Sequence, residues 1–147
     1  MVEFTRLEAG QSAELRELNR FFASVFPDPD LLVRPEPNPA EDDRWLATDA
    51  NVALVARHDR RIVGGLVAYR LDKIEGRSEI YIYDLAVAEG FRRRGVATRL
   101  IAEVQAIARA CGAWVVYVQA DYDDPPAIAL YEKLGTREEV LHFDISP

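Results

Sequence analysis

Residues 79–98 read EIYIYDLAVAEGFRRRGVAT and join two kinds of pattern. The first nine of these residues are rich in β-branched and aromatic side chains, which is typical of a strand. From residue 95 to residue 111, apolar side chains recur at the three- and four-residue spacing of an amphipathic helix. Three consecutive arginines followed by Gly95 lie between the two patterns. The stretch therefore predicts a strand, a basic loop and the start of a long helix, which Gly112 ends.

The start of this predicted helix has the chemistry of an anion site. The first backbone N–H groups of a helix have no partner within it and lie at the positive end of the helix dipole. Gly95 lets a phosphate approach the backbone, and arginines add charge and forked donors. The sequence contains neither a P-loop nor a dinucleotide fingerprint, and an ordinary basic surface loop is the alternative. The phosphate or pyrophosphate site is predicted at Arg92, Arg93, Arg94, Gly95, Val96, Ala97 and Thr98.

The rest of the chain alternates between strand-like and helix-like patterns. Further strands are predicted over residues 2–7, 51–57, 61–71, 113–120 and 137–145. Further helices are predicted over residues 12–25, 40–47 and 125–134. We expect Ser12 to cap the first helix, a hairpin turn at residues 58–60, and burial of strand 113–120 on both faces. Residues 27–39 hold five prolines and predict a loop. This order of elements indicates an α/β or α+β fold.

The composition is typical of a soluble globular protein. The 147 residues predict a single domain over residues 1–147, and 49% hydrophobic residues argue against global disorder. No membrane span or signal core is visible, and a single cysteine allows no internal disulfide, so we expect a cytoplasmic protein. That cysteine, Cys111, is expected in the core. The net charge of −7 disfavours nucleic acid as a partner and favours a cationic ligand or simply solubility. His58 and His142 lack metal-ligand spacing, so no metal is expected.

Two motifs resemble those of the GNAT N-acetyltransferases. The R-x-x-G-x-A pattern of residues 92–97, after a strand ending in LAV, is similar to the family's acetyl-CoA pyrophosphate motif. The sequence AIALYEKLG of residues 127–135 resembles the family's A-x-x-L-Y-x-K-x-G helix. Three stretches are similar to type I aminoglycoside 3-N-acetyltransferases, the gentamicin-inactivating branch. They are SEIYIYDLAV (residues 78–87), VVYVQADYDDPPAIALYEKLG (115–135) and REEVLHFDI (137–145). Asp124 stands where many GNAT members have Asn, and Phe91 replaces a frequent Tyr.

The resemblance implies a GNAT fold, which is a mixed, mostly antiparallel sheet with helices on both faces, and a homodimer. It implies direct acetyl transfer from acetyl-CoA to an amine of an aminoglycoside, with the 3-amine as the expected position and antibiotic resistance as the associated role. A polyamine or protein amine is the alternative acceptor, and a non-catalytic acyl-CoA-binding module is a further alternative. Beyond the arginine loop, the implied acetyl-CoA contacts are the backbone of Leu85, Ala86 and Val87, together with Asp124, Ala127 and Tyr131.

Asp84 is the first candidate for the catalytic base. In a regular strand it shares a face with Ile80, Ile82 and Ala86, where a carboxylate is costly unless it is paired or functional. Partial burial would raise its pKa toward a useful range, and a salt-bridged structural role is the alternative. Glu79 is a weaker candidate, because its face depends on whether the strand contains a bulge.

Tyr131 corresponds to the tyrosine that GNAT enzymes use to protonate the coenzyme A thiolate. A phenol keeps its proton at neutral pH and can donate it. A tyrosine that merely packs in the core is the alternative reading of the same position.

Acidic residues are the expected contacts of a cationic acceptor. They gather at Asp121, Asp123 and Asp124, at Asp28, Asp30, Glu36, Glu41, Asp42 and Asp43, and at Glu138, Glu139 and Asp144. We expect Asp84, Asp121 and Asp144 to face the substrate. Asp123 or Asp124 could instead cap the helix that begins at Pro125.

Overall fold

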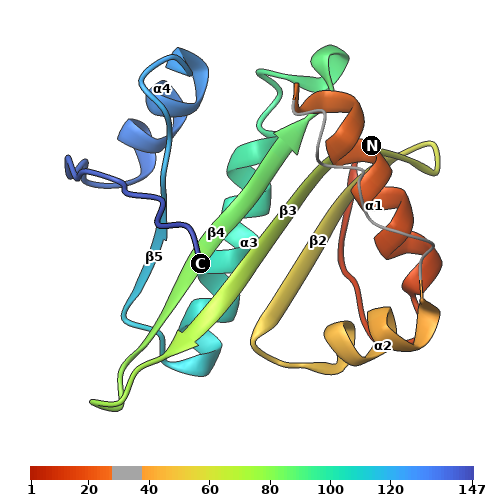
Figure 1. The fold of residues 1–147 in the computed structure, drawn as a ribbon. Helices are drawn as coiled ribbons and strands as arrows, with labels where there is room; N and C mark the ends of the chain where they lie inside the picture. Colours follow the sequence, from red (N-terminus) through yellow and green to blue (C-terminus); the bar gives the residue numbers. More distant parts are fainter. Residues whose placement is uncertain (28–37) are drawn as a thin grey trace. The chain divides into compact units, whose positions relative to one another are not determined.

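Figure 1 shows the computed structural model of the chain, which describes residues 1–27 and 38–147. The elements in chain order are β1 (Glu3–Arg6), α1 (Ser12–Val25), α2 (Pro39–Ala47), β2 (Asn51–His58), β3 (Arg61–Asp72), β4 (Ser78–Val87), the 3₁₀ turn η2 (Glu89–Phe91), α3 (Val96–Cys111), β5 (Val115–Val118) and α4 (Pro125–Leu134). The chain divides into two compact units, Met1–Tyr117 and Val118–Pro147, and each is described by itself. The expectation of a single domain over residues 1–147 stays a prediction.

The first unit is built on a mixed sheet with the strand order β1-β2-β3-β4-β5. The neighbours from β1 to β4 are antiparallel. Helix α3 then connects the end of β4 to the start of β5, which runs in the same direction as β4 (Figure 1). Asp59 and Arg60, with φ of 47° and 67°, form the predicted hairpin turn between β2 and β3. Two successive left-handed residues are the geometry of a tight hairpin that matches the strand twist.

Helices cover both faces of this sheet (Figure 1). A Cβ atom added at Gly65 would clash with Leu18 of α1, and one added at Gly64 would lie 2.8 Å from Val96 of α3. Because successive residues of a strand point to opposite faces, α1 and α3 pack on opposite sides of β3. We call the two sides the α1/α2 face and the α3 face. The predicted GNAT fold, with helices on both faces of a mixed sheet, is confirmed.

The predicted helices and inner strands agree with the structure to within about one residue at each end, but four expectations are wrong. Gln11, without a side-chain cap, precedes α1, so Ser12 is its first residue and not its cap. β5 has four residues, and all of them are partly exposed. Residues 137–145 form no strand, because no described strand pairs with them. Cys111 is exposed, because it ends α3 beyond the buried stripe of that helix.

Asp28, Asp30 and Glu36 of the predicted Pro-rich loop lie outside the described residues. Within the described part of the chain, no helix combines the length and apolarity needed to cross a membrane.

Candidate active site

A β-bulge in β4 sets the direction of the candidate base. Val67 pairs with Asp84 and Ala68 pairs with Ile82, so Tyr83 is an extra residue that β3 does not oppose. Residues paired across two strands point to the same face of a sheet. Val67 belongs to the core cluster packed under α1 and α2. Asp84 therefore points to the α1/α2 face, whereas Ile82 points to the α3 face.

This geometry corrects the expectation that Asp84 shares a face with Ile80 and Ile82. The extra residue shifts the alternation by one, so the two isoleucines lie on the opposite face. Asp84 does share its face with Ala86, which belongs to the same core cluster as Val67. The alternation before the bulge also brings Glu79 to the α1/α2 face. The bulge therefore places both candidate carboxylates on one side of the sheet.

Asp84 is half-buried, and burial raises the pKa of its carboxyl above the usual value. Among residues 1–27 and 38–147, no side chain forms an ion pair or hydrogen bond with it. The salt-bridged structural role weighed above therefore has no described partner. A half-buried carboxylate with a raised pKa is suited to accept a proton near neutral pH.

Glu79 already has a structural partner. Its Oε2 accepts a hydrogen bond of 3.2 Å from Nε1 of Trp114, which directly precedes β5. The guanidinium of Arg77 lies 4.9 Å from the centre of the same indole ring. Glu79 is therefore part of the packing at the beginning of β4, which makes it the weaker of the two candidate bases.

The basic loop turns sharply between β4 and α3. Arg93 and Gly95 have φ of 61° and 79°, both in the left-handed region, and Gly95 is the N-cap of α3. The Nε of Arg92 donates a hydrogen bond of 3.1 Å to the carbonyl oxygen of Val87 and ties the loop to the end of β4. The guanidinium of Arg94 lies 5.3 Å from the centre of the Phe91 ring. The loop is therefore folded back on itself, with its arginines exposed at the helix start.

The start of α3 fits a pyrophosphate on three counts. Among the residues that the structure describes, no side chain caps its first turn, and that turn carries no acidic residue. A Cβ atom added at Gly95 would meet no atom within 4 Å, so the backbone there is open to a ligand. Val96, the first residue of the helix, is buried and anchors the helix start against the sheet at Gly64. Free N–H groups, open space and nearby arginines together suit an anion.

Replacing Gly95 with valine is expected to weaken acetyl-CoA binding at least tenfold. A β-branched side chain would fill the open space at the helix start and strain a left-handed residue. Gly112 provides a matched control, because it caps the other end of α3 with φ of 74° and equally open surroundings. Gly112→Val should therefore strain the helix similarly without affecting the cofactor. Calorimetric affinity of folded Gly95→Val within twofold of wild type would contradict the predicted site.

The second half of β4 offers a free edge. Residues 85–87 pair with residues 64–66 of β3 along one edge of β4. The Trp114 N–H donates a hydrogen bond of 3.0 Å to the Ser78 carbonyl oxygen, so β5 begins beside the start of β4. β5 has four residues, whereas β4 has ten. Among residues 1–27 and 38–117, β5 is thus too short to reach residues 85–87. This free edge suits main-chain hydrogen bonds to an extended ligand, as expected for Leu85, Ala86 and Val87.

The second unit carries the other expected acetyl-CoA contacts. Asp124 caps α4 by accepting a hydrogen bond of 3.3 Å from the Ala127 N–H, with Pro125 as the first helical residue. Tyr131 is half-buried on the same helix. Burial and the negative charge of Asp124 raise the pKa of its phenol to about 12. Tyr131 therefore keeps its proton at neutral pH, as a donor must.

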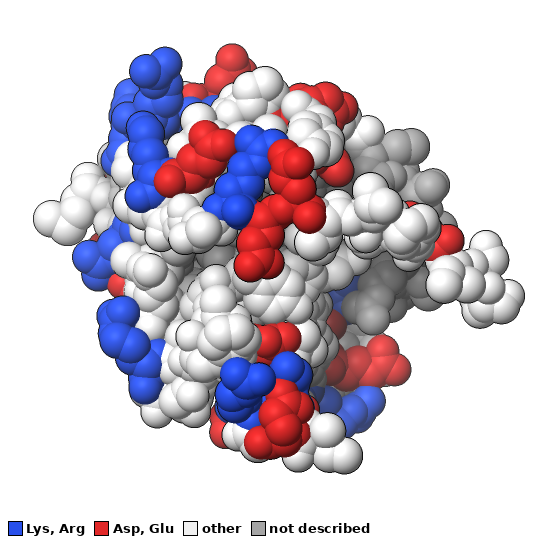
Figure 2. Space-filling model, turned by 90° about the vertical axis from the view of Figure 1, so that its left-hand side faces the viewer, with Lys and Arg blue, Asp and Glu red and all other residues white. Residues whose placement is uncertain are grey.

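Several acidic residues expected near a substrate are occupied by structural contacts. Asp42 is 3% exposed and forms an ion pair with Arg16 of α1. Asp43 accepts a hydrogen bond of 2.9 Å from the Gly10 N–H. Asp144 lies 2.9 Å from Nε2 of His142. Figure 2 shows acidic and basic side chains interspersed on the face that it draws. The negative net charge of the chain therefore does not by itself identify an acidic binding surface on this face.

Glu41 is exposed in the first unit, and the second unit exposes Asp121, Asp123, Glu138 and Glu139. The structure thus brings Asp84, the free edge of β4 and the basic loop into the first unit, and Asp121, Asp124, Tyr131 and Asp144 into the second.

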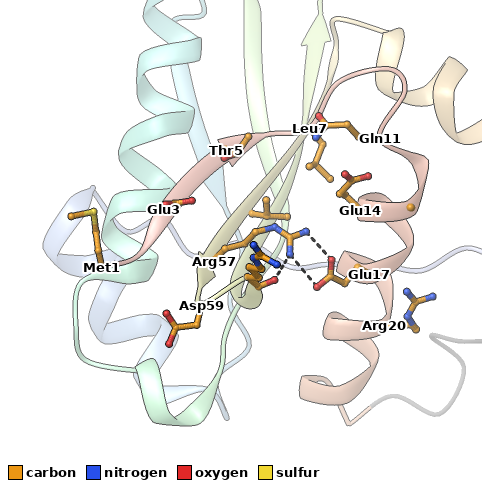
Figure 3. A pocket seen from close by; sticks show the side chains of 13 residues that line it. Met1, Glu3, Thr5, Leu7, Gln11, Glu14, Glu17, Arg20, Arg57 and Asp59 are labelled. Carbon is orange, nitrogen blue, oxygen red and sulfur yellow. Dashed lines mark hydrogen bonds and ion pairs between the residues drawn. The ribbon is translucent and has the colours of Figure 1, made fainter.

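A hollow that the sequence did not indicate lies between α1 and the strands β1 and β2 (Figure 3). Glu17 and Arg57 form a two-pronged ion pair within it, with distances of 2.7 and 3.1 Å, and Glu3 and Glu14 lie along its wall. None of the predicted catalytic or acetyl-CoA-binding residues lines this hollow. It is therefore separate from the candidate active site.

The comparisons with known proteins agree with these features. The model of the acetyltransferase (GNAT) family matches residues 14–136. The aminoglycoside acetyltransferase HMB0005, from an uncultured soil metagenomic sample, is 47% identical, with 100% of this chain and 99% of that chain covered and a TM-score of 0.94. A search of curated proteins found no match.

Two further solved structures carry ligands. The aminoglycoside acetyltransferase meta-AAC0020, from an uncultured soil metagenomic sample and solved with sisomicin, is 27% identical, with coverage of 99% and 96% and a TM-score of 0.85. AAC(6')-Iy, solved with the bisubstrate analog CoA-S-monomethyl-acetylneamine, is 18% identical, with coverage of 100% and 99% and a TM-score of 0.80. At that identity the second likeness concerns the fold alone.

Proposed function

Because the chain belongs to the acetyltransferase (GNAT) family, we propose that it transfers the acetyl group of acetyl-CoA to an amine of an aminoglycoside. The proposal that the acceptor is an aminoglycoside rests on the 47% identity to an aminoglycoside acetyltransferase over the whole chain. The sisomicin complex of a second relative supports the same class of acceptor. The sequence resemblance favours the 3-amine, whereas the fold is shared with a 6'-type enzyme. We propose the 3-amine as the position to be tested first.

In the proposed mechanism Asp84 accepts a proton from the ammonium group of the acceptor. The resulting neutral amine attacks the thioester carbonyl, which forms the C–N bond, and loss of the thiolate breaks the C–S bond. The nitrogen then loses its second proton, which replaces the proton that Tyr131 gives to the thiolate. Burial supports this role of Asp84, because a raised pKa makes the carboxylate a better proton acceptor. Tyr131 supplies an O–H donor to the departing thiolate. The start of α3 and the free edge of β4 hold the pyrophosphate and the pantetheine arm.

Tyr131→Phe is expected to lower kcat by about tenfold or more, because it removes only the hydroxyl that serves the leaving group. The KM for acetyl-CoA should change little, since the ring remains in place. Steady-state kinetics at neutral pH provide the measurement. Tyr122→Phe is the control, because Tyr122 is a 78% exposed tyrosine of the same unit. Full kcat in Tyr131→Phe would remove this residue from the mechanism.

A thiol-release assay tests the proposed acceptor directly. Wild-type protein and acetyl-CoA are incubated with gentamicin, kanamycin, spermidine or a lysine peptide, and the acetylated nitrogen is mapped on any product. Turnover of gentamicin at the 3-amine is the expected result. Turnover at another amine would overturn the position, and turnover of spermidine or peptide alone would overturn the acceptor. Acetyl-CoA binding without thiol release for any acceptor would favour the non-catalytic binding module.

A further inference from the structure

A row of aromatic rings crosses the sheet on the same face as Asp84. Its members come from α2 and the strands β3, β4 and β5, and all belong to the first unit. Neighbouring ring centres are 6.1 Å apart for Trp45 and Tyr69, 6.1 Å for Tyr69 and Tyr83, 5.7 Å for Tyr83 and Tyr81, and 4.8 Å for Tyr81 and Tyr117. The first three contacts are edge-on and the last is stacked. We call this set the aromatic row.

The bulge gives one member of the row an unusual position. Tyr83 is the extra residue of β4 and directly precedes Asp84. It is 65% exposed, although both of its neighbours in the row, Tyr69 and Tyr81, are at least partly buried. Edge-on contacts with two rings fix the orientation of the Tyr83 ring while leaving it open to solvent. A fixed, exposed aromatic ring beside a candidate base is a preorganised surface for a ligand.

The chemistry of the surroundings indicates what such a ring would hold. Burial is the main cause that raises the pKa of the Tyr81 phenol, and the charge of Asp84 adds a smaller contribution, so Asp84 lies close enough to this ring to act on it. An aromatic face attracts an ammonium group without accepting its proton. A second carboxylate would attract the same ammonium group but could also take its proton in place of Asp84. A ring next to Asp84 can therefore bind a polycationic acceptor while Asp84 takes up the proton.

We propose that Tyr83 is a specificity-determining residue, whose ring stacks against an aminocyclitol or amino-sugar ring of the acceptor or one of its ammonium groups and presents the reacting amine to Asp84. This inference rests on the proposed function. It adds to that function a contact that is neither acidic nor part of the acetyl-CoA site. It also gives the bulge a second role, because the same extra residue turns Asp84 to the α1/α2 face and exposes the ring beside it.

Three substitutions of Tyr83 separate the ring from its hydroxyl and its bulk. Tyr83→Phe keeps the aromatic face, so the KM for gentamicin should stay within about twofold of wild type. Tyr83→Leu keeps apolar bulk, and Tyr83→Ala removes it; both should raise that KM about tenfold, since both lack the π face. The KM for acetyl-CoA should be unchanged in all three. Tyr122→Ala, which removes an exposed ring of the second unit, is the control.

The affinity for gentamicin, measured by calorimetry with coenzyme A present, gives a readout that does not need turnover. Gentamicin affinity and KM of Tyr83→Ala and Tyr83→Leu within twofold of wild type would overturn the inference and leave the proposed function intact. A wild-type protein that neither binds nor acetylates gentamicin but acetylates spermidine would overturn the proposed acceptor instead. The same variants are then measured with spermidine, and unchanged KM values there would overturn the role of Tyr83 as well.

Discussion

Replacing Asp84 with asparagine is expected to lower kcat by about 10²- to 10⁴-fold, the usual contribution of a general base, while acetyl-CoA still binds. Asparagine has nearly the same shape but cannot take the proton of the acceptor ammonium. Because no described side chain pairs with Asp84, the substitution breaks no ion pair among the described residues. Steady-state kinetics and calorimetric acetyl-CoA affinity provide the two measurements. Unchanged turnover would remove Asp84 from the mechanism.

The same variant is expected to be more stable than wild type at neutral pH. Burial raises the pKa of Asp84 in the folded state, so the ionised carboxylate costs stability at any pH above that raised value. The cost is relieved as the pH falls through the folded pKa, and asparagine removes it at every pH. Thermal unfolding at pH 7 should therefore give a higher Tm for Asp84→Asn. If Asp84 instead had a structural role, the Asp84→Asn variant would have a lower Tm than wild type.

The pH dependence of kcat/KM provides a third readout of this carboxylate. Activity should fall on the acid side with an apparent pKa above the 3.8 of a free aspartate, because the protonated form of Asp84 cannot accept a proton. Glu79→Gln decides between the two carboxylates on this face. If Glu79 is the base, its glutamine variant loses turnover and Asp84→Asn keeps it.

The sequence predicted the elements whose signals are local. Helix α3 follows from an apolar spacing and from Gly112 at its end, and the cap of α4 follows from Asp124 before Pro125. Each of these signals lies within a few residues of the boundary that it sets. The chemistry of the loop before α3 is equally local, since Arg92–Arg94 and the left-handed Gly95 are adjacent in the chain.

The direction of Asp84 could not be predicted from its own strand. It depends on which residue of β4 is left without a partner in β3, and that choice belongs to the pairing of Val67 and Ala68. A one-residue shift turns every later side chain to the other face. The alternating tyrosines of the sequence EIYIYD were the visible signal of the aromatic row, but only the bulge shows that Tyr83 and Asp84 share its face.

The role of Asp42 was hidden for a similar reason. The sequence presents Glu41, Asp42 and Asp43 as one acidic run, and nothing local distinguishes them. Their environments differ because Arg16, which lies 26 residues earlier, pairs with Asp42 alone. The run therefore looked like a surface for a cationic substrate, although its middle member is the buried partner of an arginine.

Asp42→Ala is expected to lower the free energy of unfolding by about 3–5 kcal/mol, the usual cost of leaving a buried charge without its partner. The Nε of Arg16 donates a hydrogen bond of 2.7 Å to Oδ2 of Asp42, and its Nη2 donates a second one to Oδ1. The pair joins α1 to α2, the two helices that cover the face to which Asp84 points. Urea unfolding monitored by tryptophan fluorescence provides the measurement.

Asp43→Ala is the matched control, because it removes a neighbouring carboxylate that makes one exposed hydrogen bond to the Gly10 N–H. Its expected cost is about 1 kcal/mol. The double variant Arg16→Met, Asp42→Leu should regain most of the lost stability, since an apolar pair carries no desolvation penalty. If Asp42 instead bound the acceptor, Asp42→Ala would raise the acceptor KM and lose no more stability than Asp43→Ala. Because Arg16 already neutralises and encloses this carboxylate, we expect the loss of stability with the acceptor KM unchanged.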